Sequence, residues 1–116
     1  MTIIYHQFDV VVVPFPFTDR EATKRRPALV LSDSANFNNI INCSVMAMIT
    51  TASHSSWPLD IPIENLVSAG LKSPSLIRMK LFTLDHQLMI KTIGRLAEND
   101  QLQVQAVLQT LFNITR

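Results

Sequence analysis

Residues Asp9–Ser32, DVVVVPFPFTDREATKRRPALVLS, decide how this chain folds. Asp9–Val13 contains four consecutive valines, and such a β-branched run predicts a strand that is buried on both faces. The Pro-Phe-Pro-Phe run after it predicts the end of that strand, because proline lacks an N–H and restricts the residue before it. Polar Thr18–Arg25 predicts an exposed loop. Pro27–Ser32 then predicts a second strand that opens with proline, a position where proline is tolerated.

Further short strands follow along the chain, separated by polar segments. The expected strands are Ser44–Thr50, an edge strand at Leu59–Ile63, Ser75–Lys80 and Ile90–Leu96. Asp33–Asn42 predicts a loop with one helical turn, and Glu64–Gly70 predicts a single turn of helix that ends at Gly70. Thr83–Asp85 predicts the turn between the last two strands.

The end of the chain has the period of a helix. Apolar residues recur with helical spacing from Leu102 to Phe112, and Asn99 or Asp100 is available as the helix cap. Five or six short strands closed by one helix predict a mainly β fold. We expect a small antiparallel barrel that forms one domain over residues 1–116.

Composition limits the classes of function. Hydrophobic residues make up 47% of the chain and charged residues 16%, which excludes a disordered tail protein. Such a low charged fraction favours a surface that a partner or a second subunit covers. The chain has 2 glycines, too few for a glycine-rich phosphate loop.

The cysteine content indicates the compartment. Cys43 is the only cysteine, so no internal disulfide can form, and we expect a cytoplasmic protein. The first residues lack a basic segment followed by an apolar run and do not resemble a signal peptide. No apolar stretch approaches the length of about 18 residues that a membrane span needs.

Positive charge is concentrated, although the formal net charge is only +1. Four cations fall between positions 20 and 26: Arg20, Lys24, Arg25 and Arg26. A concentrated basic segment can bind a polyanion locally in a near-neutral protein. Phe15, Phe17 and Trp57 lie in or beside loops near this segment and could stack on single-stranded bases. The alternative is that Phe15 or Phe17 fills the end of the barrel or a dimer seam.

Several motifs extend from the first expected strand to the last: PFPFTD with KRRPALVLS, Ala47–Thr50, Ala69–Ser75, Thr83–Asp85 and Ile93–Leu96. In this order they resemble the MazF/PemK-like toxins of bacterial type II toxin–antitoxin systems, over nearly the whole chain. The resemblance implies an SH3-like barrel, a homodimer and an endoribonuclease that cuts single-stranded RNA without a metal or other cofactor. It also implies a small antitoxin protein as partner.

The resemblance also implies which residues act. The family's catalytic arginine, directly before the proline, falls on Arg26, and its catalytic threonine, at the end of the Ala-x-Ile-Thr strand, falls on Thr50. A glutamate that some members carry five residues before the arginine falls on Glu21. RNA-binding residues are expected around them, namely Lys24, Arg25, Phe17, Thr18 and His54.

The chemistry of these residues suits metal-free RNA cleavage, in which the neighbouring 2′-OH is the nucleophile. The planar, ionised guanidinium of Arg26 can stabilise charge on the phosphorane, although it is a poor general base. The Thr50 hydroxyl can orient the 2′-OH or hold a phosphate oxygen. The structural alternatives are loop solvation for Arg26 and a simple strand end for Thr50. Glu21 is either a general base or one half of an exposed ion pair.

The three histidines are the remaining acid–base candidates. His54 follows Thr50 by four residues and could reach the same site, whereas His6 and His86 have no comparable neighbour. No cysteine or carboxylate spacing accompanies them, so no metal site is predicted. Asp9 is expected to have a structural capping role at the start of the first strand.

Two other functions stay open at this point. A CcdB-like toxin on the same barrel would bind DNA gyrase without catalysis, through residues of its C-terminal helix. A degenerate toxin would only bind antitoxin. The occurrence of Arg26 before Pro27, together with Thr50, favours the nuclease.

Overall fold

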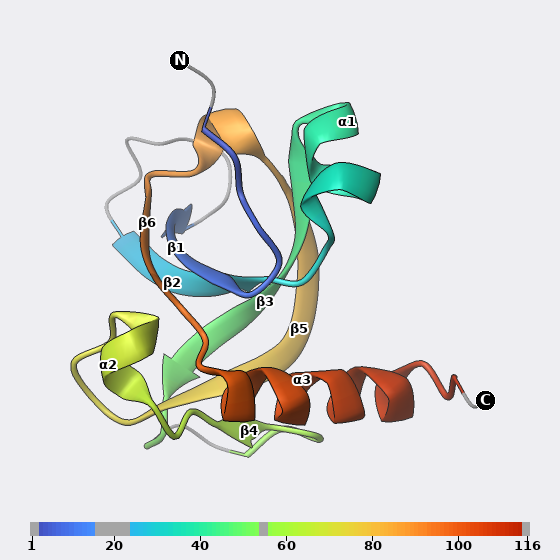
Figure 1. The fold of residues 1–116 in the computed structure, drawn as a ribbon. Coiled ribbons are helices and arrows are strands. Elements are labelled where there is room, and N and C mark those ends of the chain that lie inside the picture. Colours follow the sequence, from blue (N-terminus) through green and yellow to red (C-terminus); the bar gives the residue numbers. More distant parts are fainter. Residues whose placement is uncertain (1–2, 16–23, 54–55, 115–116) are drawn as a thin grey trace.

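The computed structural model describes residues 3–15, 24–53 and 56–114 and contains one curled sheet with a C-terminal helix (Figure 1). The strands are β1 (Asp9–Phe15), β2 (Lys24–Val30), β3 (Cys43–Thr51), β4 (Ile61–Pro62), β5 (Ser75–Asp85) and β6 (Lys91–Arg95). The α-helices are α1 (Asn39–Ile41), α2 (Leu66–Ala69) and α3 (Glu98–Leu111), and a short π-helix at Ser34–Asn38 directly precedes α1. The described strands follow the order β4-β5-β3-β2-β1-β6 with antiparallel pairing throughout. This half-barrel confirms the predicted fold class.

The first two strands are longer than predicted, and they extend toward each other. β1 does not end before Pro14: it continues to Phe15, and β2 begins at Lys24 instead of Pro27. The pairing of β1 with β6 stops at Val12, so beyond that residue β1 has only β2 as a neighbour. Proline is tolerated at such an edge because its missing N–H needs no partner on the open side.

The predicted turn at Thr83–Asp85 is wrong, because these residues belong to β5. The strand has 11 residues, and its last three pair with Cys43–Val45 at the start of β3. The turn follows instead as a short 3₁₀ helix at His86–Leu88. Thr83–Asp85 pair because β3 extends back to Cys43, and this long-range pairing outweighs the turn propensity of Asp85.

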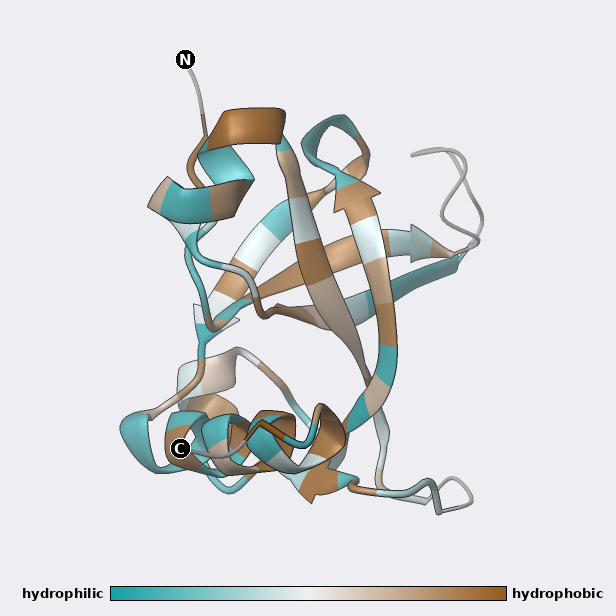
Figure 2. Ribbon diagram, turned by 90° about the vertical axis from the view of Figure 1, so that its right-hand side faces the viewer, coloured by the Kyte–Doolittle hydropathy of each residue, from teal (hydrophilic) through white to brown (hydrophobic). Residues whose placement is uncertain are grey.

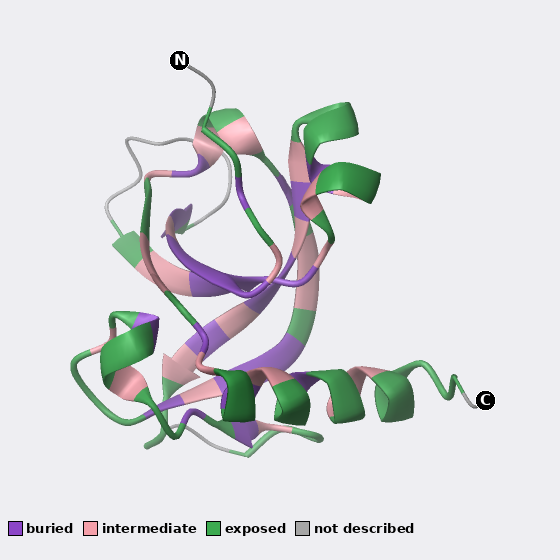
Figure 3. Cartoon of the chain, in the orientation of Figure 1, coloured by how far each residue is buried: buried purple, intermediate pink, exposed green. Residues whose placement is uncertain are grey.

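The sheet carries a hydrophobic core on each face, which explains why β1 is buried on both sides as predicted (Figure 3). One cluster joins the sheet to α3 and includes Val10, Leu29, Ile49, Ile77 and Val104. The other lies on the opposite face and includes Val11, Val13, Ala28, Val30 and Met46. Figure 2 shows apolar residues recurring along the strands and alternating with polar residues along α3.

The start of α3 differs from the prediction that Asn99 or Asp100 caps it. Ala97 occupies the N-cap position, and no side chain caps the helix. Asp100 is fully buried, and its carboxylate accepts hydrogen bonds from the backbone N–H groups of Glu64 and Asn65, each at 3.0 Å. It therefore holds the segment that leads into α2. Within the described ranges, no helix combines the length and apolarity needed to cross a membrane.

Gly70 and Gly94 bring α2 into direct contact with β6. Gly70 ends α2, as predicted, with a φ of 74°, and a Cβ added there would lie 2.1 Å from the backbone oxygen of Ile93. A Cβ on Gly94 would lie 2.4 Å from the backbone carbon of Ala69. The two glycines of the chain thus permit a backbone-to-backbone contact that no larger residue allows.

Candidate functional site

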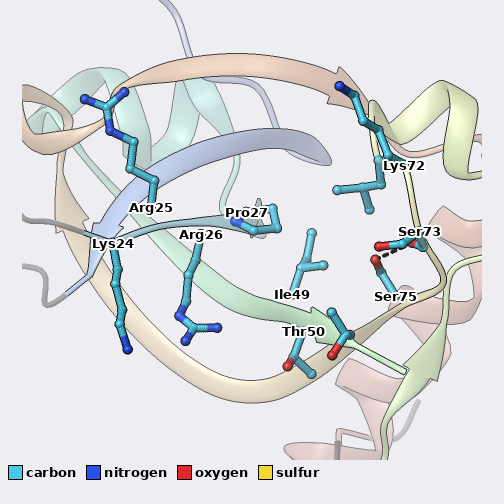
Figure 4. A pocket seen from close by; sticks show the side chains of 11 residues that line it. Lys24, Arg25, Arg26, Pro27, Ile49, Thr50, Lys72, Ser73 and Ser75 are labelled. Carbon is cyan, nitrogen blue, oxygen red and sulfur yellow. Dashed lines mark hydrogen bonds between the residues drawn. The ribbon is translucent and has the colours of Figure 1, made fainter. Parts of the chain in front are cut away.

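Arg26 lies near the start of β2 and Thr50 near the end of β3, and the two residues share a site. The pairing of the two strands stops at Ala28 with Met48, and Arg26 and Thr50 each lie two residues beyond that pair. Both residues line the same two clefts, and both side chains point to the same side of the strands in Figure 4. The sequence motifs predicted a shared site for Arg26 and Thr50, and the fold brings them together.

Arg25 points away from Arg26, as alternation along an extended strand requires. In Figure 4, Arg26 and Lys24 extend to one side of β2, and Arg25 extends to the other. Lys24 and Arg25 are exposed, whereas Arg26 is half-buried. The side chains of the three adjacent cations are therefore divided between the two faces of the sheet.

Two clefts meet at this pair of residues. One, of about 430 Å³, is called here the aromatic cleft and is also lined by Phe15, Met48, Arg78, Lys80 and Phe82. The other, of about 420 Å³, is called the serine–lysine cleft and is also lined by Lys24, Arg25, Lys72, Ser73 and Ser75. Six cations and no carboxylate occur among the described residues that line the two clefts. Such a surface attracts anions.

The guanidinium of Arg26 is held in place but not fully hydrogen-bonded. Its Cζ lies 5.0 Å from the centroid of the Phe15 ring, within the range of a cation–π interaction. Its Nε is buried and has no hydrogen-bond acceptor among the described residues. A buried donor without an acceptor is costly, so this arrangement favours a ligand that brings an acceptor to Arg26.

A second basic group borders the aromatic cleft, and the sequence analysis did not predict its residues as part of the site. Arg78 on β5 donates two hydrogen bonds to Asp60, from Nε at 3.1 Å and from Nη2 at 2.9 Å. The hydrogen bond to Asp60 raises the pKa of Arg78, and burial opposes this shift. Arg78, Lys80 and Phe82 alternate along β5. That alternation was the available signal that they share one face.

Trp57 belongs to this second group and not to the basic segment near which it was expected. Its ring lies 5.8 Å from Arg78 Cζ and 5.1 Å from Lys80 Nζ. Phe15, in contrast, does contact the basic segment through Arg26. Phe15 therefore lies beside Arg26, and Trp57 lies beside the cations of β5.

Several predicted site residues lie outside the described ranges. These are Glu21, Phe17, Thr18 and His54. Their roles stay predictions. Among the described residues, no three His, Cys, Asp or Glu side chains are grouped so that they could hold a metal ion.

Asp9 and His86 have structural contacts away from the two clefts. Asp9 accepts a hydrogen bond from the backbone N–H of His6 at 2.8 Å and forms an ion pair with Arg95 at 3.4 Å. His86 Nε2 lies 2.8 Å from Ser44 Oγ, and the ring contacts Tyr5. Burial lowers the pKa of His86, although the charge of Asp85 and a backbone hydrogen bond to Cys43 oppose this shift. His86 lies near the Cys43 end of β3, the end remote from Thr50.

The sequence matches one protein family over most of its length. A model described as the PemK-like, MazF-like toxin of type II toxin–antitoxin system matches residues 6–112. No curated protein matches the sequence.

Solved structures share this fold over nearly the whole chain. The MazE–MazF complex (Form-II) from Deinococcus radiodurans has 17% identity and a TM-score of 0.75, covering 98% of this chain and 100% of that chain. An endoribonuclease in complex with its cognate antitoxin from Mycobacterial species has 15% identity and a TM-score of 0.77, covering 99% of each chain. The Mycobacterium tuberculosis toxin MazF-mt6 has 17% identity and a TM-score of 0.72, covering 93% and 99%.

These matches confirm the resemblance seen in the motifs, from the PFPFTD stretch to the strand around Gly94. The family model spans both strand ends that carry Arg26 and Thr50. The chain belongs to the PemK-like, MazF-like toxins of type II toxin–antitoxin systems.

Proposed function

We propose that this toxin is a metal-independent endoribonuclease that cleaves single-stranded RNA in the cytoplasm. The observation that carries the proposal is the position of Arg26, whose buried Nε has no acceptor among the described residues, beside Thr50 at the junction of two cation-lined clefts. A phosphodiester bound at this junction would supply the missing acceptor, and its neighbouring nucleotides would extend into the two clefts.

Cleavage proceeds by attack of the 2′-oxygen on the adjacent phosphorus. The 2′-OH loses its proton, the new O–P bond forms, and the bond to the 5′-oxygen breaks. The 5′-oxygen takes up a proton and leaves as a hydroxyl, and the other fragment keeps a 2′,3′-cyclic phosphate. Negative charge gathers on the phosphoryl oxygens during this step, and Arg26 stabilises it with a fixed guanidinium.

The other residues have supporting roles in this proposal. Thr50 orients the 2′-OH or holds a phosphate oxygen with its hydroxyl. Glu21 is the candidate general base. Lys24 and Arg25 bind the RNA backbone, and Phe17, Thr18 and His54 are proposed to bind RNA next to them.

The proposed partners are a cognate antitoxin and a second copy of the chain. The antitoxin is supported by a similar structure that is described as an endoribonuclease in complex with its cognate antitoxin. An acidic antitoxin segment would cover the cations around Arg26, and its binding should weaken strongly at about 1 M salt. The low charged fraction of 16% supports a homodimer, since a second copy would cover apolar surface. Sedimentation as a stable monomer at micromolar concentration would contradict the dimer.

The function is tested by incubating the protein with a long single-stranded RNA in EDTA. We expect cleavage at a few short sequences, with cyclic phosphate ends. An RNA with a single 2′-deoxyribose at a mapped cut site should resist cleavage at that site only. Cleavage of the deoxy site would contradict the mechanism. No cleavage at all would contradict the nuclease and leave a gyrase-binding or an antitoxin-binding toxin.

A further inference from the structure

Trp57 contacts two residues of β5 that line the aromatic cleft, although it does not itself line that cleft. Arg78 and Lys80, which line the cleft, also lie over the indole ring, at 5.8 Å and 5.1 Å. Trp57 nevertheless stays 41% exposed. A large aromatic side chain that is fixed by two cations and still open to solvent forms a platform that a ligand can use.

The backbone around Trp57 is tied to the same strand. The Trp57 N–H donates to the Asp60 carboxylate at 3.0 Å, and the Asp60 N–H donates to the Trp57 carbonyl at 3.2 Å. The Asp60 carboxylate also accepts both hydrogen bonds from Arg78. Asp60 therefore fixes Trp57 relative to β5 before any ligand arrives, which lowers the entropic cost of binding.

The charge beside Trp57 is only partly balanced. Arg78 forms its ion pair with Asp60, whereas Lys80 is exposed and forms no ion pair with a described residue. Lys80 thus adds a positive charge between the indole ring and the cleft that contains Arg26. An exposed aromatic face next to such a cation is the arrangement that binds single-stranded nucleic acid, with a base on the ring and a phosphate on the cation.

We propose that Trp57 and Lys80 form a nucleotide subsite next to Arg26, in which a base of the RNA stacks on the indole and Lys80 contacts the adjoining phosphate. This inference rests on the proposed function, because it assigns the subsite to the RNA strand that Arg26 and Thr50 cleave. Every base has a face that can stack, so the subsite tightens binding with little sequence preference. Base stacking requires an unpaired base, which restricts the substrate to single strands.

Trp57 reports on its own subsite because it is the only tryptophan of the chain. A short 2′-O-methyl RNA cannot be cleaved by 2′-oxygen attack, so it can be titrated into the intact protein while indole fluorescence is measured. We expect saturable quenching that weakens as salt is added. Poly-L-glutamate should leave the fluorescence almost unchanged. Equal quenching by the two polymers would overturn the proposal and assign this surface to an acidic protein partner.

Variants then separate stacking from charge, with Kd measured by anisotropy of a labelled 2′-O-methyl RNA. Trp57→Ala should raise Kd by about 5- to 150-fold, and Trp57→Phe, which keeps an aromatic face, by much less. Lys80→Gln should reduce the slope of log K against log salt by about 0.7, the contribution of one phosphate contact on a single strand. Lys91→Gln, which removes an exposed cation from β6, is the matched control for net charge and should bind like the parent.

The cleavage assay distinguishes a failure of this inference from a failure of the proposed function. On cleavable RNA, Trp57→Ala should raise KM and leave kcat within about threefold. The reason is that the subsite binds the RNA equally well in the ground state and in the transition state. RNA cleavage with an unchanged Kd in Trp57→Ala would overturn the subsite and leave the nuclease standing. Quenching without any cleavage would leave the subsite standing as a single-strand binding site and overturn the nuclease.

Discussion

The two ends of β3 differ in how their buried polar groups are satisfied. At the Cys43 end, Ser44 lies 2.8 Å from His86, and the buried amide of Asn38 donates to the carbonyls of Tyr5 at 2.8 Å and Ser32 at 2.9 Å. At the Thr50 end, the neighbouring Arg26 buries an Nε that has no acceptor among the described residues. Polar groups that are satisfied within the protein stabilise the fold, whereas a buried donor without an acceptor is available to a ligand.

The charge distribution reinforces this contrast. Six cations line the clefts at the Thr50 end, and within the described residues only one of them, Arg78, forms an ion pair. Both ends belong to one strand and share one sheet, so the difference does not arise from a separate domain. Substitutions at the Cys43 end should change stability alone, and substitutions at the Thr50 end should change activity alone.

The largest expected effect is that of Arg26→Ala on RNA cleavage. Removing a charge that stabilises the transition state typically costs a factor of about 10²–10³ in rate, or about 3–4 kcal/mol. The fold should not change, because Arg26 is half-buried at a strand end and forms no ion pair with a described residue. Single-turnover cleavage and thermal unfolding, measured on the same preparation, check both statements.

Arg25→Ala is the matched control for Arg26→Ala, because it removes an adjacent arginine that points to the other side of β2 (Figure 4). It should weaken RNA binding and lower the salt dependence by about one phosphate contact, with little change in the rate of the bound complex. Equal loss of rate in the two variants would contradict the assignment of Arg26 as the catalytic arginine.

At the other end, Asn38→Ala should have the largest effect on stability. The fully buried side chain donates to two backbone carbonyls and accepts from the Ser32 hydroxyl, and alanine would leave these groups without partners. Unsatisfied buried groups cost about 1–3 kcal/mol each, so we expect a loss of about 3 kcal/mol in the free energy of unfolding. Denaturant titration measures this. A loss of cleavage by folded Asn38→Ala protein would contradict the separation of the two ends.

Two hydroxyl groups on β3 allow a smaller test within one strand. Thr50→Val should slow cleavage by about tenfold, corresponding to one hydrogen bond, since valine keeps the shape and removes the hydroxyl. Ser44→Ala should instead lower the free energy of unfolding by about 1 kcal/mol, because the buried hydroxyl lies 2.8 Å from His86. The cleavage rate and the free energy of unfolding are measured for both variants. If Ser44→Ala cleaves RNA more slowly than Thr50→Val, the separation of the two ends of β3 is contradicted.

Much of the fold was predictable because local signals agree with the final pairing. The valine run of β1, the buried strand around Ala47 and the stop at Gly70 depend on residue type alone. Pro14 and Thr83–Asp85 were assigned wrongly because their conformation depends on which strands lie beside them. Asp100 was assigned wrongly as a cap because its burial against Glu64 and Asn65 depends on how α3 packs.

The candidate site divides in the same way. Arg26 and Thr50 were predicted from motifs at the ends of two neighbouring strands, and strand register brings such ends together. The group formed by Trp57, Asp60 and Arg78 was not predicted, because its contacts join a loop to β5 across 18 residues of sequence. Alternation along β5 indicated a shared face, but no local pattern indicated which loop lies above it.

The smallest expected effect is the pH dependence that His86 adds at the Cys43 end. Burial lowers its pKa in the folded protein, so the folded state favours the neutral ring more than the unfolded chain does. The unfolded chain therefore binds more protons just below the ordinary histidine pKa of about 6.5. The free energy of unfolding is then highest above about pH 6.5 and falls as the pH decreases toward the lowered pKa.

His86→Gln keeps a hydrogen-bonding group near Ser44 and removes this titration, so its stability should fall less between about pH 7.5 and pH 5.5. Denaturant midpoints of the parent and the variant at both pH values measure the difference. Identical pH dependence in the two proteins would contradict a lowered pKa of His86 in the folded state, and a change in relative cleavage rate would contradict its separation from the Thr50 end.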